Sequence, residues 1–393
     1  MINQLTKSKE MKKIWIGISV IVVVLVIVLI VTQPKKEPEE IKPEVIKPEV
    51  IKIGHIAPFT GDAAIWGQWA KEGIDLAVDE INLKGGIKGK KLVVIHEDDH
   101  GEPDKAVSAI KKLITVDKVQ IIIGGVTSGA TLACAPIAEQ KRVVLLSHGA
   151  AANKISYAGD YVFRIFPSNA QQAERLIEIA QRLKIMKASN LFINNDYGAE
   201  LAEVVKKRFE ESGGTILSSE GYEAEATDFK TQLTKIKDTA PQAIFLLGYP
   251  KDMALVLKQA KEMGINVQFL APDTFDTPEI LEWSGGAAEG VIYVYPALLQ
   301  TDRLEKFAEV LKKKFQKEPN VMNTMGYDAI RLLAEAIEKG GYEGTQIKKA
   351  LYELRDFPGV TGEITFDKNG DVIHRPLGIR IVKDGKFMEY EIK

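Results

Sequence analysis

Apolar and polar positions from Lys52 to Ile95 change their spacing twice within a short distance. A run of apolar residues typical of a buried strand is broken at Pro58 and Gly61, and residues with helical spacing follow from about Ile65 to Leu83. A Gly-Gly pair ends this helical pattern, and a second apolar strand begins at Lys91. The pattern predicts a βαβ unit, in which the helix returns the chain so that the two strands run in parallel.

The same alternation continues as far as residue 272. We expect strands over 119–125, 143–147, 189–194, 215–222, 243–249 and 267–272, and helices over 128–140, 199–212 and 252–264. Strands that alternate with helices of this length favour parallel α/β sheets with helices on both faces. The loops at the carboxyl ends of the strands are then expected to form the binding crevice.

The pattern changes after Thr301. Three helices are expected at about 302–316, 324–339 and 347–354, and short strands follow them. Turn signals at Asn369-Gly370 and Asp384-Gly385 separate these strands, which are therefore predicted to form hairpins.

The segment Ile14–Val31 is a run of eighteen residues without a charge, long enough to cross most of a bilayer. Lysines ahead of the run give a modest bias that places residues 1–13 in the cytoplasm and the bulk of the chain outside. A cleaved signal peptide is the alternative, but the sequence VTQP at the end of the run offers no A-x-A-like cleavage site. We therefore expect residues 14–31 to be a retained, single-pass anchor in the cell membrane.

Residues 32–50 are rich in Pro, Lys and Glu and contain the repeat IKPEV-IKPEV. Regularly spaced prolines favour an extended, semi-rigid spacer. The folded part is thus expected to begin near Ile51 and to stand away from the membrane.

Composition narrows the class of protein. A chain of 393 residues with 45% hydrophobic residues is long enough for two ordinary domains. The formal net charge of -2 shows no basic excess, so a nucleic-acid partner has no electrostatic support. The single cysteine, Cys134, allows no intrachain disulfide, and its apolar surroundings in the sequence favour a buried packing role.

Two motifs suggest metal sites and are rejected. The run from His96 to His100 matches the H-E-x-x-H zinc pattern, which requires both histidines on one helical face, but here it ends an apolar strand and a Gly and a Pro follow. The segment Asp367–Asp371 resembles a calcium loop but lacks the closing glutamate, so a tight hairpin is the better interpretation. We find no phosphate loop or nucleophile elbow. We expect no metal, no cofactor and no enzymatic activity.

A polar turn follows the strand at 119–125. The residues from Val126 to Ala130 lead from this strand into a helix, which makes Ser128 a candidate N-cap. Free backbone N–H groups and the positive end of the helix suit a ligand carboxylate. The alternative is that Ser128 only caps its helix.

The βαβ unit at Lys52–Ile95 and the strand ends at Ser128, Tyr197, Tyr249 and Asp273 resemble the branched-chain amino-acid-binding proteins. These are type I solute-binding subunits of ABC importers. The resemblance implies two doubly wound α/β lobes joined by a three-segment hinge. The chain is expected to cross near Pro167, near Pro296 and after Asp371, which gives one lobe at 51–167 plus 297–373 and another at 168–296 plus 374–393.

The resemblance also implies a set of ligand-binding residues. A serine at the position of Ser128 holds the amino acid's carboxylate in that family, tyrosines like Tyr197 and Tyr249 close over the ligand, and an acid at the place of Asp273 pairs with its ammonium. Ala151 stands where the family has Thr, so one hydroxyl is missing. The expected ligand-binding set is Trp66, Thr127, Ser128, Ala150, Ala151, Tyr197, Tyr249 and Asp273.

The function implied by the resemblance is that of an extracytoplasmic solute-binding protein, which captures a small amino acid between two lobes and delivers it to an ABC permease. A branched-chain amino acid is the default ligand, while Trp66 and Ala151 leave room for other small amino acids, their amides or a carboxylate without an amine. The alternative function is a ligand-sensing receptor domain for amino acids, amides or small carboxylates.

Overall fold

The computed structural model describes Met11 and residues 15–25 and 50–391, and the chain divides into two units at 1–48 and 49–393. Residues 15–25 are helical and expose their apolar side chains. No helix among the described residues is long and apolar enough to cross a membrane. The rest of the expected anchor at 14–31, most of the N-terminal segment 1–13 and the linker up to residue 49 lie outside the described residues.

The first sheet of the folded unit is entirely parallel and has the order β2-β1-β3-β4-β5. Its strands are β1 (Val50–Ala57), β2 (Lys91–Asp98), β3 (Ile121–Ile123), β4 (Val144–Ser147) and β5 (Val162–Arg164). Helix α2 (Ala64–Leu83) connects β1 to β2, and the two strands pair in parallel from Val50↔Lys91 onward. The predicted βαβ unit is confirmed.

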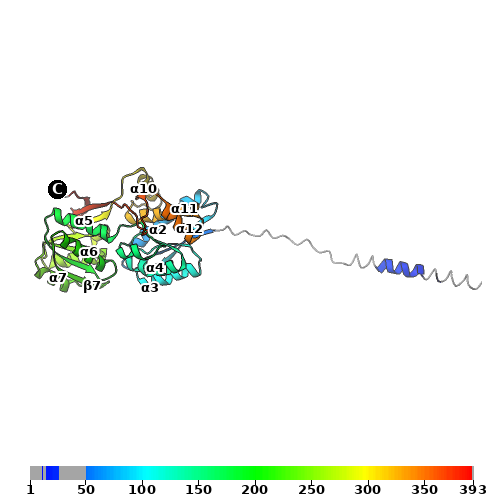
Figure 1. Cartoon of the computed structure of the whole chain (residues 1–393), viewed down its shortest axis with the longest axis horizontal. Coiled ribbons are helices and arrows are strands. Elements are labelled where there is room, and N and C mark those ends of the chain that lie inside the picture. The colour runs from blue at the N-terminus through cyan, green and yellow to red at the C-terminus, as the bar shows by residue number, and fades with distance from the viewer. Residues whose placement is uncertain (1–10, 12–14, 26–49, 392–393) are drawn as a thin grey trace, which may run out of the picture. The chain divides into compact units, whose positions relative to one another are not determined.

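Helices cover both faces of this sheet because successive buried residues of its strands point to opposite sides. In β3, Ile121 and Ile123 join the apolar cluster formed with α2 and α11 (Val321–Gly340), while Ile122 joins the cluster formed with α3 (Pro103–Thr115) and α4 (Ser128–Lys141). Two further helices, α10 (Asp302–Phe315) and α12 (Gly344–Glu353), belong to the same part of the chain (Figure 1).

The second sheet has the order β14-β13-β10-β9-β8-β6-β7. Five of its strands run parallel to one another: β6 (Lys187–Ile193), β7 (Thr215–Tyr222), β8 (Ala243–Leu247), β9 (Gln268–Ala271) and β10 (Ile292–Pro296). The antiparallel strands β13 (Leu377–Lys383) and β14 (Lys386–Glu389) extend it at one edge. The helices of this part of the chain are α5 (Asn169–Arg182), α6 (Gly198–Glu211), α7 (Lys230–Asp238), α8 (Pro250–Glu262) and α9 (Glu279–Trp283).

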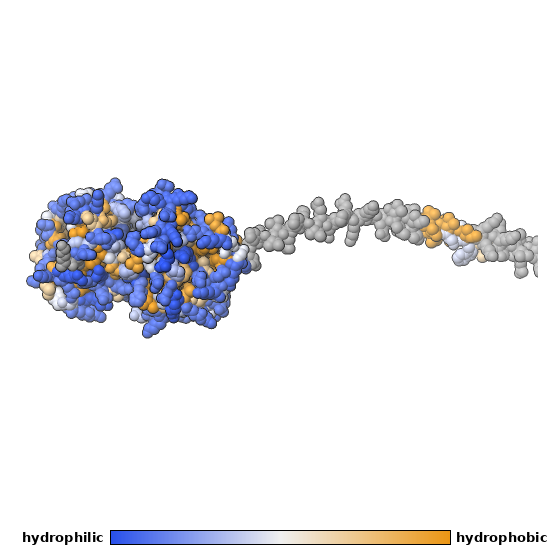
Figure 2. Space-filling view, turned by 90° about the horizontal axis from the view of Figure 1, so that it is seen from above, coloured by the Kyte–Doolittle hydropathy of each residue, from blue (hydrophilic) through white to orange (hydrophobic). Residues whose placement is uncertain are grey.

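The two sheets form two lobes, which Figure 1 shows side by side with α2, α3 and α4 in one and α5, α6 and α7 in the other. The chain passes between them after β5, after β10 and before β13. The lobe boundaries expected at 51–167 plus 297–373 and at 168–296 plus 374–393 stay predictions. In the view of Figure 2 the surface of the folded unit is mostly hydrophilic.

The short strands near the end of the chain form hairpins, as expected. Strand β11 (Phe357–Gly359) pairs antiparallel with β12 (Gly362–Ile364), and β13 pairs with β14 around the turn at Asp384-Gly385. A tight turn closes at Gly370, where Phe366 and Val372 form an antiparallel bridge. The hairpin interpretation of Asp367–Asp371 is thereby confirmed.

Helices α2 and α11 approach each other closely enough to exclude a side chain at two glycines. A Cβ added at Gly73 lies 1.8 Å from the backbone oxygen of Asn323, and one added at Gly326 lies 2.4 Å from the oxygen of Ala70. Both clashes are with backbone atoms, which cannot move without shifting a helix. The close approach of α2 to α11 holds the start of α2 in place, and this start carries Trp66.

We predict that Gly73→Ala lowers the free energy of unfolding by about 2 kcal/mol or more, because the added methyl group forces the two helices apart. Chemical denaturation followed by circular dichroism measures the effect. The control is Asp79→Ala on the exposed side of α2, whose ion pair with Lys314 is solvent-accessible and whose loss is expected to change stability by less than about 1 kcal/mol. Equal stability of Gly73→Ala and the wild type would contradict the tight packing.

Candidate functional site

The turn between β3 and α4 is capped by Thr127 rather than by Ser128. The backbone of Thr127 is extended, at φ -87° and ψ 151°, and its hydroxyl accepts a hydrogen bond from the N–H of Ala130. Ser128 is the first residue of the helix. The expectation that Ser128 is the N-cap was therefore wrong, and its side chain is available for another role.

The hydroxyl of Ser128 binds the loop that follows β4. The N–H groups of Ala151 and Ala152 donate to Ser128 Oγ at 3.3 Å and 3.1 Å. These two bonds occupy both lone pairs of the oxygen, so the O–H proton of Ser128 remains to be donated. The N–H of Ala150 donates to Ser147 Oγ instead, and Ala150 and Ala151 are both buried.

Tyr197, Tyr249 and Asp273 come together at the carboxyl ends of β6, β8 and β9. The two tyrosine rings are stacked, with centroids 5.8 Å apart and an interplanar angle of 15°. Tyr197 Oη donates to Asp273 Oδ1 across 3.5 Å, a long hydrogen bond. Asn195 Nδ2 donates to Tyr249 Oη at 3.3 Å, which fixes the orientation of the second ring.

Trp66, at the start of α2, joins this group from the other lobe. Its ring meets that of Tyr249 edge to face, with centroids 5.2 Å apart, and its Nε1–H donates to Thr277 Oγ1 across 3.4 Å. An ion pair between Asp62 and Lys251 at 2.8 Å also spans the two lobes. The structure thus brings Trp66, Tyr249, Tyr197 and Asp273 into one continuous cluster.

Two hollows lie beside this cluster. A cavity of about 50 Å³ is lined by two of the expected ligand-binding residues, Trp66 and Asp273. A larger cleft of about 550 Å³ is lined by two others, Thr127 and Tyr249. Ser128, Ala150, Ala151 and Tyr197 line neither hollow in this conformation.

Sequence reasoning missed several residues that line the smaller cavity, among them Phe166, Thr277, Asn320 and Met322. Asn320 had a detectable signal: together with Asn323 it forms a capping box at the start of α11. The pattern N-x-x-N at this position could have shown that a helix begins there. The other three side chains reach the cavity only through tertiary packing, for which we find no sequence signal.

The histidine motif does not form a zinc site. His96 lies in β2 and His100 in the following turn, with a left-handed φ of 52°, so the two do not share a helix. His96 instead contacts His55 through their Nδ1 atoms at 2.8 Å and Asp75 Oδ1 at 3.3 Å. Among residues 15–25 and 50–391, no group of three or more candidate ligands could hold a metal ion.

Comparison with known proteins matches residues 50–386 of this chain to the family described as periplasmic binding protein. The chain belongs to this family. The match covers the first sheet, the second sheet up to the start of β14, and every residue of the expected ligand-binding set.

Three relatives of this periplasmic binding protein are informative. A leucine-, isoleucine-, valine-, threonine- and alanine-binding protein of Pseudomonas aeruginosa is 30% identical over 82% of this chain and 87% of its own length. The crystal structure of a leucine-binding protein from Thermotoga maritima has a TM-score of 0.82 at 30% identity, covering 87% of this chain and 98% of the other. A branched-chain amino-acid transporter substrate-binding protein of Streptococcus pneumoniae, solved with isoleucine, has a TM-score of 0.79 at 29% identity, covering 86% and 98%.

These comparisons support a binding role for the cleft. The family and these relatives are solute-binding proteins of transport systems, and such proteins are not enzymes. The two-lobed α/β fold expected from the sequence is confirmed by the same matches.

Two half-buried carboxylates, Asp273 and Asp252, have shifted pKa values at the cleft. Burial raises the pKa of Asp273 to about 7, and the hydrogen bond with Gln172 opposes this shift only in part. Burial likewise raises the pKa of Asp252, on the wall of the larger cleft, to about 7 although Tyr222 Oη donates to its carboxylate. A cation placed beside either carboxylate would favour its charged form.

His148 follows β4 directly and lies next to the loop that Ser128 holds. It is completely buried, neither ring nitrogen has a hydrogen-bond partner in the described part of the chain, and the ring of His55 lies 5.4 Å away. Burial lowers the pKa of His148 to about 4. The neutral ring is therefore the form that the fold accommodates.

We predict that His148→Leu reduces the acid sensitivity of the protein. In the unfolded state His148 takes up a proton below its ordinary pKa of about 6.5, whereas in the folded state it does so only below about pH 4. Between these two pH values protonation favours the unfolded state. The free energy of unfolding of the wild type therefore falls by about 3 kcal/mol as the pH drops through this window. Urea denaturation at several pH values measures the difference between the two proteins. The exposed His374 provides the control variant, His374→Gln, which should keep the wild-type profile. Parallel curves for wild type and His148→Leu would contradict the prediction.

Proposed function

We propose that this chain captures a branched-chain amino acid between its two lobes and delivers it to the permease of an ABC importer. The observation that carries the proposal is Asp273, a carboxylate enclosed with the rings of Tyr197, Tyr249 and Trp66. Within residues 50–391 no Lys, Arg or His forms a salt bridge with it. An ammonium group of a ligand supplies the missing positive charge.

Ser128 provides the complementary group. Its O–H, left over after the hydroxyl accepts from Ala151 and Ala152, donates to the carboxylate of the ligand. Its position at the first residue of α4 adds the favourable field of a helix N-terminus. Asp273 and Ser128 thus recognise the two charged ends that all amino acids share.

The aromatic rings select the side chain. Trp66 and the tyrosine pair present apolar faces that suit an aliphatic group, and Val126 and Met322 line the adjoining cavity. Thr127 forms part of the wall of the larger cleft. The relatives bind leucine, isoleucine and valine according to their names, which agrees with a ligand of this size. Backbone contacts of Ala150 and Ala151 with the ligand stay a prediction, because in this conformation their N–H groups donate to Ser147 Oγ and Ser128 Oγ.

We predict that Asp273→Asn weakens the binding of L-leucine about a hundredfold, because an amide cannot neutralise the ammonium group in a buried site. Isothermal titration calorimetry of the purified protein measures the dissociation constant. Asp62→Asn is the matched control: this carboxylate is paired with Lys251 at the partly exposed rim, and its loss should change the affinity by less than about threefold. Equal binding of leucine and of 4-methylpentanoate, its analogue without the amine, would show that Asp273 does not hold an ammonium group.

The same contact links binding to pH. The pKa of Asp273 is about 7 in the absence of a cation and falls when an ammonium group lies beside it, so binding below pH 7 must release a proton. The affinity for leucine is accordingly expected to rise with pH up to about 7, by at most about tenfold per pH unit, and to stay level above that. Asp273→Asn removes this dependence. Calorimetry in buffers of different ionisation enthalpy counts the protons directly.

We further propose that residues 14–31 anchor the chain in the cell membrane with the binding lobes outside. The support is the run of eighteen uncharged residues, together with the helix at residues 15–25, whose exposed side chains include Trp15 and Ile16. Much of this helix is orange, that is hydrophobic, in Figure 2. The Pro-rich segment at 32–50 then acts as a spacer.

We predict that the full chain stays in the membrane fraction after an alkaline carbonate wash. Val22→Arg places a charge within the apolar run, at an insertion cost of about 3 kcal/mol, and should release part of the protein into the supernatant. The same charge placed just beyond the run, in Gln33→Arg, serves as the control and should leave the chain in the membrane. Complete release of the wild type by the wash would contradict the anchor.

A further inference from the structure

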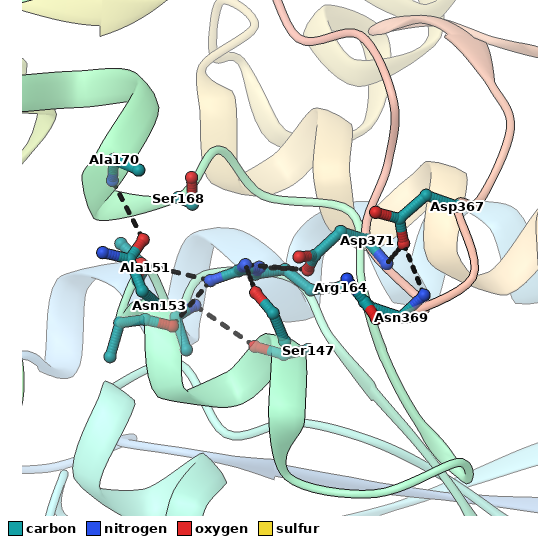
Figure 3. A network of polar contacts seen from close by, with 12 residues as sticks. Ser147, Ala151, Asn153, Arg164, Ser168, Ala170, Asp367, Asn369 and Asp371 are labelled. Atoms are coloured by element: carbon teal, nitrogen blue, oxygen red, sulfur yellow. Dashed lines mark hydrogen bonds and ion pairs between the residues drawn. The ribbon is translucent and has the colours of Figure 1, made fainter. Parts of the chain in front are cut away.

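A buried arginine lies behind the expected carboxylate-binding loop. Arg164 ends β5, is 1% exposed and lines neither of the two hollows. Its guanidinium group donates four hydrogen bonds and forms an ion pair with Asp371 (Figure 3). Nε donates to Asp371 Oδ1 at 2.8 Å and Nη2 donates to Ser156 Oγ at 2.8 Å, while Nη2 also lies 2.7 Å from Asp371 Oδ1 in the ion pair.

The two hydrogen bonds from Nη1 hold the loop itself. Nη1 of Arg164 donates to the carbonyl oxygen of Ala151 at 3.1 Å and to that of Ala152 at 2.8 Å. A peptide unit is planar, and in a trans unit the C=O and the following N–H point in opposite directions. By fixing these two carbonyls, Arg164 therefore also fixes the directions of the N–H groups of Ala152 and Asn153.

Each of those N–H groups has a defined partner. The N–H of Ala152 donates to Ser128 Oγ at 3.1 Å, and that of Asn153 donates to Glu200 Oε1 on α6 of the other lobe. The first bond sets which way the remaining O–H of Ser128 can point. Arg164 thus acts on Ser128 through a peptide unit, at a distance from the cleft.

The anchor of Arg164 lies where the chain passes between the lobes. Asp371 belongs to the turn that Asp367 shapes by accepting from the N–H groups of Asn369 and Asp371, at 2.8 Å and 3.0 Å (Figure 3). The backbone of Arg164 is tied to the same turn, since its N–H donates to Gly370 O at 2.8 Å and its C=O accepts from Val372 at 3.0 Å. The turn, β5 and the loop therefore form one connected unit.

We propose that Arg164, held by Asp371, is a positioning residue for ligand binding: it orients the Ala151–Asn153 backbone so that Ser128 presents its O–H to the ligand carboxylate. The inference rests on the proposed function, because it assigns the carboxylate to Ser128. The inference adds to the site a residue, Arg164, that lines neither hollow and would act on the ligand only through Ser128.

A second buried arginine of the same region provides the matched control. Arg375 is 6% exposed and donates to Ile165 O at 2.8 Å and to Thr361 O at 2.9 Å, without contact to the loop at 150–153. Loss of either guanidinium group removes hydrogen bonds to buried carbonyl oxygens, which lowers stability, although Ala151 O keeps the N–H of Asn169 at 2.7 Å. Only Arg164 is expected to affect the loop.

The test uses the full chain with Arg164→Lys, Asp371→Asn and Arg375→Lys. A lysine keeps the positive charge but cannot reach both carbonyls and the carboxylate in the planar arrangement of a guanidinium group. We expect the thermal midpoint to fall in both lysine variants. The dissociation constant for L-leucine should rise about tenfold or more in Arg164→Lys, by a smaller factor in Asp371→Asn, and less than about twofold in Arg375→Lys.

Amide hydrogen exchange of the ligand-free protein tests the positioning independently of ligand. Protection of the amides of Ala152 and Asn153 should fall at least tenfold more in Arg164→Lys than in Arg375→Lys. Unchanged exchange at these amides, or unchanged leucine affinity in a folded Arg164→Lys variant, would overturn the inference while leaving the proposed function intact. Failure of the wild type to bind any amino acid would overturn the proposed function instead, and the exchange measurement would still decide whether Arg164 orients the loop.

Discussion

The backbone between Ser147 and Asn153 is the constraint on which the rest of the site depends. This loop is buried at Ala150, Ala151 and Ala152 but lies largely outside a sheet or a helix, so side chains must satisfy its polar groups. The donors and acceptors come from four places: Ser128 on α4, Ser147 at the end of β4, Arg164 with its partner Asp371, and Glu200 and Asn169 from the other lobe. The N–H groups of Ala150, Ala151, Ala152 and Asn153 all have partners, so their directions are fixed before a ligand arrives, and this part of the loop has little ordering entropy left to lose on binding.

The cleft combines this fixed polar loop with carboxylates that burial makes easy to protonate. Asp273 and Asp252 both have their pKa raised to about 7, so near neutral pH a small change in their surroundings moves a proton. A ligand with an ammonium group shifts Asp273 toward its charged form, whereas a ligand without one meets a carboxyl group that is already partly neutral. If Asp273 holds the ammonium group as proposed, the same carboxylate discriminates ligands by charge and is accommodated as a neutral carboxyl group when the cation is absent.

The sequence predicted correctly the elements whose structure depends on residues only a few positions apart. The βαβ unit at residues 52–95 and the hairpins near Gly370 and Gly385 follow from hydrophobic spacing and turn residues, which act over a few positions. The cap of α4 was misassigned because Thr127 and Ser128 are equally good capping residues, and only the extended backbone at Thr127 decides between them. The pairing of Arg164 with Asp371 joins residues 207 positions apart, and a lone arginine at the end of a short strand carries no sign of its partner. Packing of the whole lobe brings them together.

The contacts that join the lobes at the cleft are individually weak. The Asp62–Lys251 ion pair is partly exposed and contributes about 0 to 1 kcal/mol, and the Trp66–Thr277 hydrogen bond is long at 3.4 Å. The closer contacts between the lobes are those of the Asn169 N–H with Ala151 O and of Glu200 with the Asn153 N–H, and they lie at the loop near the crossing segments, where an opening rotation displaces atoms least. Closed and open arrangements of such a molecule differ by little free energy, so a ligand that bridges Ser128 on one lobe and Asp273 on the other shifts the population by its own binding energy. Weak contacts at the cleft are therefore what allows the ligand, rather than the protein alone, to determine closure.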